Sequence, residues 1–139
     1  GYYSRIYVNL EKREPNGKVK MEEYEDVLKQ LKSDFRKIRG PNGEGWDNIV
    51  HEPKEVYREV KGDPPDLMLY LDNLSWRPAG TIGWNTLYLP ENDRGPDDAE
   101  HDWYGVFAIY DPEETLEEGL RGEIRIEAIF QRLIGALNA

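Results

Sequence analysis

One run of residues constrains the fold more than any other part of this chain. Residues 66–72 read Asp-Leu-Met-Leu-Tyr-Leu-Asp, an apolar run between two aspartates. A short continuous apolar run bounded by turn-forming residues is typical of a strand that is buried on both faces. The sequence therefore predicts a sheet that other elements cover on both sides.

Other segments have strand character too. Residues 2–10 alternate apolar and polar side chains around Ile6 and Val8, and residues 103–110 (WYGVFAIY) form a second apolar run that predicts a buried strand. Residues 48–60 and 81–89 carry weaker extended patterns. We expect the sheet to contain Ile6–Val8, Leu67–Leu71 and Val106–Ile109.

Two amphipathic helices are expected to cover this sheet. Residues 21–39 place apolar side chains at helical spacing, with acidic residues at the start and basic residues at the end, an order that suits the helix dipole. Residues 123–137 show a second stripe of this kind. The predicted fold class is α/β, with a mixed α+β arrangement as the alternative. The first stripe consists of Met21, Tyr24, Leu28, Leu31, Phe35 and Ile38.

Charge and composition exclude several classes of function. The 139 residues include 18 Lys and Arg against 28 Asp and Glu, a net charge of −10, and the pI is about 4.7. Such a balance argues against nucleic-acid binding, which needs a basic surface. The absence of cysteine excludes disulfides, thiolate metal sites and a cysteine nucleophile. No apolar run is long enough for a membrane span, so we expect a cytoplasmic protein, and its composition is compatible with a thermophilic source.

The two histidines differ in their surroundings. His51 lies in an extended segment, where a surface or hydrogen-bonded structural role is expected. His101 ends an acidic loop with Asp97 and Asp98, and Asp102 follows it directly before the second apolar run. Imidazole and carboxylate ligands suit zinc or manganese, so His101 is the candidate metal ligand and the three aspartates are candidates for shaping the site. The alternative is a solvated acidic loop that contains one histidine.

No other pattern marks an active site. The sequence lacks a nucleophile elbow, a phosphate-binding glycine loop and the zinc-protease helix motif, so it identifies no catalytic residue. Arg13 is a weak candidate for binding an anion. A salt bridge to Glu11 or Glu14, or plain solvation, is the expected alternative.

An ordered set of motifs points to a family. The set begins with the run from Ile6 to Val19 (IYVNLEKREPNGKV), and it continues with Glu23-Tyr24-Glu25, Pro65-Asp66-Leu67, the loop 95–101 with its following strand, and Ile134-Gly135. In order and spacing, this set resembles the C-terminal portion of type I phosphodiesterase-like phosphohydrolases of the alkaline phosphatase superfamily. The chain departs from the family pattern at Asp111-Pro112, where Gly-Pro is usual, and at residues 128–132, where an Asp-x-x-Pro-Thr element is usual.

The resemblance implies a part of an alkaline phosphatase-like fold. Residues 1–65 would form a cap-like element, and residues 66–139 would supply the final strands and helix of a core sheet, as a single domain or a fragment. In that family the nucleophile and most metal ligands precede this region, and the last histidine corresponds to His101. The implied function is that of a segment of a metal-dependent phosphoester hydrolase, with zinc or manganese as cofactor, inactive in isolation.

Two other interpretations remain open. The chain could be a stand-alone acidic binding or assembly module with a degenerate metal site, or a small structural domain without a ligand. The expected partners are the remainder of the parent chain or a second copy of this chain. Neither nucleic acid nor a membrane is an expected partner.

Overall fold

A small antiparallel sheet organises the N-terminal part of the protein. The computed structural model describes residues 2–89, 101–110 and 122–137, which fall into two compact units, Gly1–Tyr104 and Gly105–Ala139. The first unit holds the sheet, whose strand order is β1-β3-β2, with both pairings antiparallel. Its strands are β1 (Ser4–Ile6), β2 (Ile49–His51) and β3 (Leu67–Tyr70).

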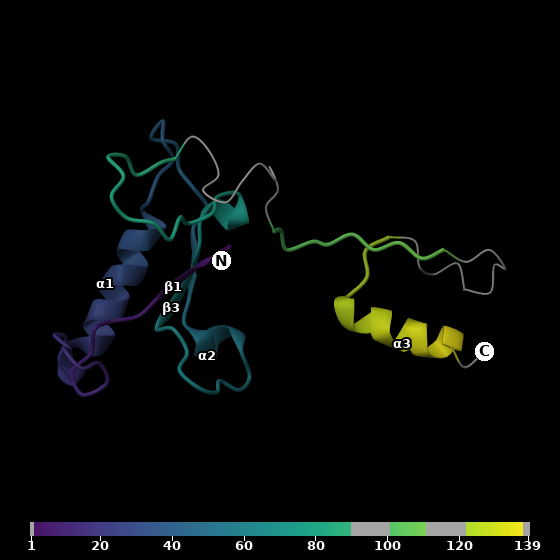
Figure 1. The fold of residues 1–139 in the computed structure, drawn as a ribbon, viewed down its shortest axis with the longest axis horizontal. Helices are drawn as coiled ribbons and strands as arrows, with labels where there is room; N and C mark the ends of the chain where they lie inside the picture. The colour runs from purple at the N-terminus through teal and green to yellow at the C-terminus, as the bar shows by residue number, and fades with distance from the viewer. Residues whose placement is uncertain (1, 90–100, 111–121, 138–139) are drawn as a thin grey trace. The chain divides into compact units, whose positions relative to one another are not determined.

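One face of the sheet packs against the long helix α1 (Tyr24–Arg36), which a 3-10 turn, η1 (Met21–Glu23), precedes (Figure 1). Leu69 of β3 pairs with Ser4 of β1 and with Val50 of β2, so these residues point to the same face. Leu28 of α1 is buried in the cluster on this face, while the other apolar residues of the helix are partly buried around it. The helix predicted over residues 21–39 is present as η1 and α1 but ends at Arg36, and Met21 of the predicted stripe is exposed.

The opposite face of the sheet is covered by aromatic rings. Met68 and Tyr70 point to this face and are buried with Leu74. The ring of Tyr3 stacks on that of Tyr70 at a centroid distance of 5.2 Å, and the ring of Trp103 lies 4.9 Å from it. All four residues of β3 are buried, which confirms the prediction of a strand covered on both sides.

A compact loop joins β1 to η1. The backbone N–H of Glu11 donates to the carbonyl of Val19 at 2.9 Å, and that of Lys18 donates to Asn9 at 2.8 Å, so the loop closes on itself. A Cβ atom on Gly17 would lie 2.2 Å from the backbone oxygen of Leu10. The loop can therefore close in this way only with glycine at position 17.

Two shorter elements complete the first unit, α2 (Pro53–Val56) and the 3-10 turn η2 (Asp72–Leu74). The Lys32 ammonium of α1 donates to Glu52 at 3.0 Å and to Glu55 at 2.8 Å. Because the side chain of Lys32 is only 15% exposed, this pair of contacts ties α1 to the start of α2 where water has little access.

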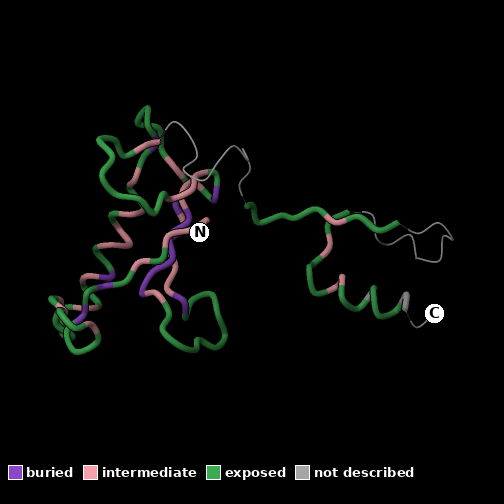
Figure 2. Tube along the Cα trace, in the orientation of Figure 1, coloured by how far each residue is buried: buried purple, intermediate pink, exposed green. Residues whose placement is uncertain are grey.

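The second unit contains one helix, α3 (Ile126–Leu137), within the described residues. The helix was predicted from the stripe in residues 123–137. Several of its large apolar side chains are exposed, however: Ile126 is 79% exposed and Phe130 62% exposed. Figure 2 shows the contrast: the buried positions gather around β3, and the residues of α3 whose burial is described are all intermediate or exposed.

Two expected strands are absent from the structure. Residues 106–109 form no strand, and Val106 is fully exposed, because no neighbouring strand among the described residues offers hydrogen bonds to this run. The third strand is β2, from the weakly patterned segment 48–60. Residues 81–89 also form no strand. The first unit extends past residue 65, and its sheet takes strands from both sides of that position.

The mixed α/β class is confirmed in this coarse sense: a small antiparallel sheet with a few helices. None of the helices in the described part of the chain has the length and apolar character that crossing a membrane requires.

Candidate functional site

The most strongly connected polar group in the described residues is the carboxylate of Asp66. Asp66 directly precedes β3, and its backbone N–H donates to the carbonyl of Ile6 at 2.8 Å, which fixes the residue beside β1. Only 4% of its side chain is exposed. A buried carboxylate is costly unless several donors surround it, so its partners decide whether it is structural or reactive.

Arg13 supplies two of these donors. The closed loop after β1 carries Arg13 to Asp66, where its two terminal nitrogens each donate to a carboxylate oxygen at 2.7 Å. One of these nitrogens also donates to the carbonyl of Val8 at 2.5 Å, and Nε donates to Glu14 at 3.0 Å. Every nitrogen of the guanidinium group thus has a partner within the protein. The expected Glu14 contact is present, and the anion that Arg13 clamps is Asp66.

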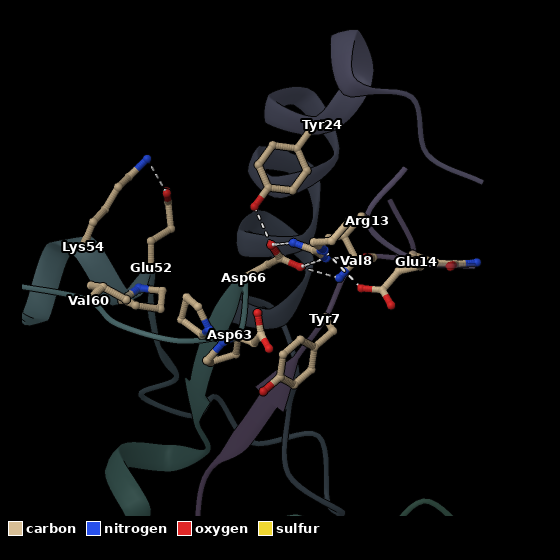
Figure 3. A pocket seen from close by; sticks show the side chains of 14 residues that line it. Tyr7, Val8, Arg13, Glu14, Tyr24, Glu52, Lys54, Val60, Asp63 and Asp66 are labelled. Atoms are coloured by element: carbon tan, nitrogen blue, oxygen red, sulfur yellow. Dashed lines mark hydrogen bonds and ion pairs between the residues drawn. The ribbon is translucent and has the colours of Figure 1, made fainter. Parts of the chain in front are cut away.

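The donor set of Asp66 is completed by Tyr24 and Val8. The Tyr24 hydroxyl, from the first turn of α1, donates to one carboxylate oxygen at 2.5 Å, and the backbone N–H of Val8 donates to the other at 2.6 Å. Figure 3 shows this arrangement, in which side chains from the loop, α1 and the residue before β3 meet at one point.

The proton affinities follow from these contacts. Burial by itself would raise the pKa of Asp66, but the hydrogen bonds from Arg13, Tyr24 and Val8 outweigh it and hold that pKa below its ordinary value. Burial, and then the hydrogen bond to the ionised carboxylate, raise the pKa of Tyr24 to about 12. The hydrogen bond to Asp66 also raises the pKa of Arg13. Near neutral pH the cluster is therefore an ion pair capped by a neutral phenol, an arrangement that holds protons in place instead of exchanging them.

A hollow of about 810 Å³ opens beside this cluster. Its lining includes Arg13, Tyr24 and Asp66 on one side, and Glu52 with Lys54 of α2 on another (Figure 3). Lys54 donates to Glu52 at 2.7 Å. A smaller hollow of about 260 Å³ shares the loop Val60–Pro65 as part of its wall. The larger volume lies in the range of small-ligand sites.

The predicted metal ligand His101 has no hydrogen bond, ion pair or ring contact with Arg13, Tyr24 or Asp66 among the described residues, and its ring contact is with Tyr2. Its ring is exposed and lies 3.7 Å, centroid to centroid, from the ring of Tyr2. The carboxylate of Asp102 accepts a hydrogen bond from the backbone of Trp103 at 2.6 Å. Asp97 and Asp98 lie outside the described residues. Within the described ranges, no three His, Asp or Glu side chains come together as a metal site requires, so His101 and Asp102 do not form a complete ligand set.

His51 has the structural environment expected for it. It lies at the end of β2, its Nδ1 atom is 3.7 Å from a carboxylate oxygen of Glu55, and its ring meets the edge of Tyr70. Neither contact brings it toward the cluster at Asp66.

Sequence reasoning missed the Asp66 cluster. Arg13 and Asp66 are 53 residues apart, and nothing in their local patterns links them. One signal was available: Arg13, Tyr24 and Asp66 each belong to one of the motifs that carry the family resemblance.

Neither the models of protein families, nor the curated proteins, nor the solved structures include a match to this chain.

Proposed function

We propose that this chain is the C-terminal segment of a metal-dependent phosphoester hydrolase of the alkaline phosphatase superfamily. The observation that carries the proposal is the convergence of three resemblance motifs on one carboxylate. Arg13 comes from the first motif, Tyr24 from the second and Asp66 from the third, and all three meet in one hydrogen-bonded cluster.

His101 would be the contribution of this segment to the metal site. Its imidazole is exposed, and neutral imidazole is a good ligand for zinc or manganese. The described residues do not supply the further ligands that such an ion needs. We therefore expect the isolated chain to be inactive and the remaining ligands to come from the parent protein.

The test uses the parent protein, if its gene extends upstream of this segment. His101→Ala should sharply reduce both bound metal, measured by elemental analysis, and hydrolysis of a bis-aryl phosphodiester. His51→Ala is the matched control and should leave the metal content unchanged. Full metal content and full activity in the His101→Ala protein would contradict the proposed role.

A second candidate function, assembly with another copy, rests on α3. Ile126, Phe130, Leu133 and Ile134 are all at least 40% exposed on this helix. Contiguous exposed apolar surface of this kind promotes association. Sedimentation should show self-association of the chain that the double change Phe130→Glu and Leu133→Glu abolishes, whereas Glu127→Gln on the same helix leaves it intact. A monomer at high protein concentration would contradict this candidate.

A further inference from the structure

The 810 Å³ hollow beside the Asp66 cluster has an unbalanced set of charges. Four carboxylates line it, those of Glu14, Glu52, Asp63 and Asp66, against the two cations Arg13 and Lys54, so the lining carries 2 − 4 = −2. Both cations are already paired, Arg13 with Asp66 and Glu14, and Lys54 with Glu52. Within this larger hollow, an anion would therefore meet carboxylates without a free cation to receive it, whereas a cation would be attracted. The adjoining smaller hollow also has Arg5 and Lys61 in its wall, so the preference for a cation belongs to the larger hollow.

Asp63 is the carboxylate that a ligand could engage. It is exposed, it lines both hollows, and no hydrogen bond or ion pair to it occurs among the described residues. The other three carboxylates of the large hollow each have a positively charged partner. A cation that bound at Asp63 would thus gain a charge-assisted contact without breaking one.

The remaining wall is apolar and aromatic. Tyr7 lines both hollows and is 51% exposed, and Pro53, Pro64, Pro65 and Val60 also line both. The face of a tyrosine ring attracts a cation, and prolines offer a rigid surface for an aliphatic stem. Figure 3 shows Tyr7, Asp63 and Val60 around the same hollow.

We propose that this hollow binds an organic cation, an ammonium or guanidinium group on an apolar stem, with the charge at Asp63 and the stem against Tyr7 and the prolines. The same chemistry has two sources, a free aliphatic amine or a Lys or Arg side chain of a peptide. This site is independent of His101 and of the proposed hydrolysis.

Calorimetric titration of the chain tests the proposal with matched probes. Cadaverine and glutarate have the same carbon chain length and opposite charge, and a capped Gly-Arg-Gly peptide presents the cation on a side chain. Cadaverine, the peptide or both should bind, glutarate should not, and the affinity should fall as salt is added. Binding of cadaverine alone assigns the site to free amines, and binding of the peptide alone assigns it to protein side chains.

Two variants locate the site. Asp63→Asn should weaken binding of the cation at least about tenfold, the loss expected when a charge-assisted contact is removed. Tyr7→Leu should weaken it by a smaller factor. The control Asp47→Asn changes an exposed aspartate outside the hollow and should have no effect. The proposal is overturned if no cation binds at millimolar concentration, if glutarate binds equally well, or if Asp63→Asn binds like the unchanged protein.

Discussion

Helices α1 and α3 have similar amphipathic patterns and opposite surroundings. On α1, Leu28 is 2% exposed and packs against the sheet, whereas on α3 Phe130 is 62% exposed. The apolar runs differ in the same way: residues 67–70 form the central strand, and residues 103–110 form no strand. A pattern of apolar residues thus specifies which face of an element can be buried, but burial requires a partner surface.

The largest difference is expected when an apolar side chain of each helix is replaced by alanine. Leu28→Ala should lower the free energy of unfolding by about 2–5 kcal/mol, because it leaves a cavity in the core. Phe130→Ala removes a larger side chain that is mostly in solvent in the single chain, so at concentrations too low for self-association we expect a change below about 0.5 kcal/mol. Urea denaturation checks both values, and a large loss in the Phe130 variant would show that α3 is packed in solution.

The first unit also contains the ion pair between Arg13 and Asp66, which should contribute to its stability. Asp66→Asn should cost about 2–3 kcal/mol, because it removes charge-assisted hydrogen bonds and leaves Arg13 with Glu14 as its remaining counter-ion. The cost stays below that of a fully buried pair because the Arg13 side chain is 37% exposed.

The same pair predicts a dependence of stability on pH. The pKa of Asp66 is lowered in the folded state, so its stabilising contribution is fully present above the unfolded pKa of about 3.9 and is lost as the pH falls through the folded pKa. Denaturation should be measured at several pH values between 2 and 6. The free energy of unfolding should then change less with pH for Asp66→Asn than for the unchanged protein.

Glycine substitutions test how closely the backbone is packed in each unit, beginning with Gly17 of the first unit. Gly17→Ala should destabilise the first unit by about 1–3 kcal/mol, since the added methyl group meets the Leu10 backbone at 2.2 Å. Gly45→Ala is the control within that unit, because the nearest atom to its added methyl group lies at 4.0 Å.

The matching glycine of α3 should respond in the opposite direction. Nothing lies within 4 Å of a Cβ atom on Gly135, so Gly135→Ala should stabilise the helix by up to about 1 kcal/mol. Circular dichroism of the purified variants should show a higher helical signal for this change. A loss of helical signal would indicate a close contact at that position.

The phenol that caps the ion pair should contribute less to stability than the ion pair itself. Tyr24→Phe removes the hydroxyl that donates to Asp66 while keeping the ring in the core, and should cost about 1 kcal/mol. Thermal unfolding of Tyr24→Phe should be compared with that of Tyr88→Phe. The Tyr88 hydroxyl donates to the carbonyl of Arg39 at an exposed position, so its loss should cost less. Equal losses in the two variants would argue against a special role for the cluster.

Local patterns were sufficient for several elements. The stripe in residues 21–39 predicted a helix, found as α1 and η1, and the apolar run at 67–71 predicted the strand that became β3. These predictions succeeded because helical spacing and a bounded apolar run are properties of neighbouring residues. The predicted strand at 106–109 was wrong, and β2 was underestimated, because strand formation depends on hydrogen bonds to distant segments.

For the candidate site, too, the chemistry of single residues was predictable from the sequence, whereas their contacts were not. The chemistry that His101 can offer is evident from its residue type, and its role as a metal ligand stays a prediction. The environment of Arg13 could not be foreseen, because its principal partner is Asp66, 53 residues away. The hollow at Asp63 could not be predicted from the sequence either, since its walls come from the segment after β1, from α2 and from the loop before β3.

The amino-acid sequence by itself determined the net charge of −10, the absence of thiol chemistry, the two amphipathic helices and the strand at the centre of the sheet. The tertiary structure alone decided which apolar faces are buried and which charges meet. The physical reason is that composition and periodicity are local, whereas the burial of Leu28, the ion pair of Asp66 and the open carboxylate of Asp63 depend on surfaces that the fold brings together from distant parts of the chain.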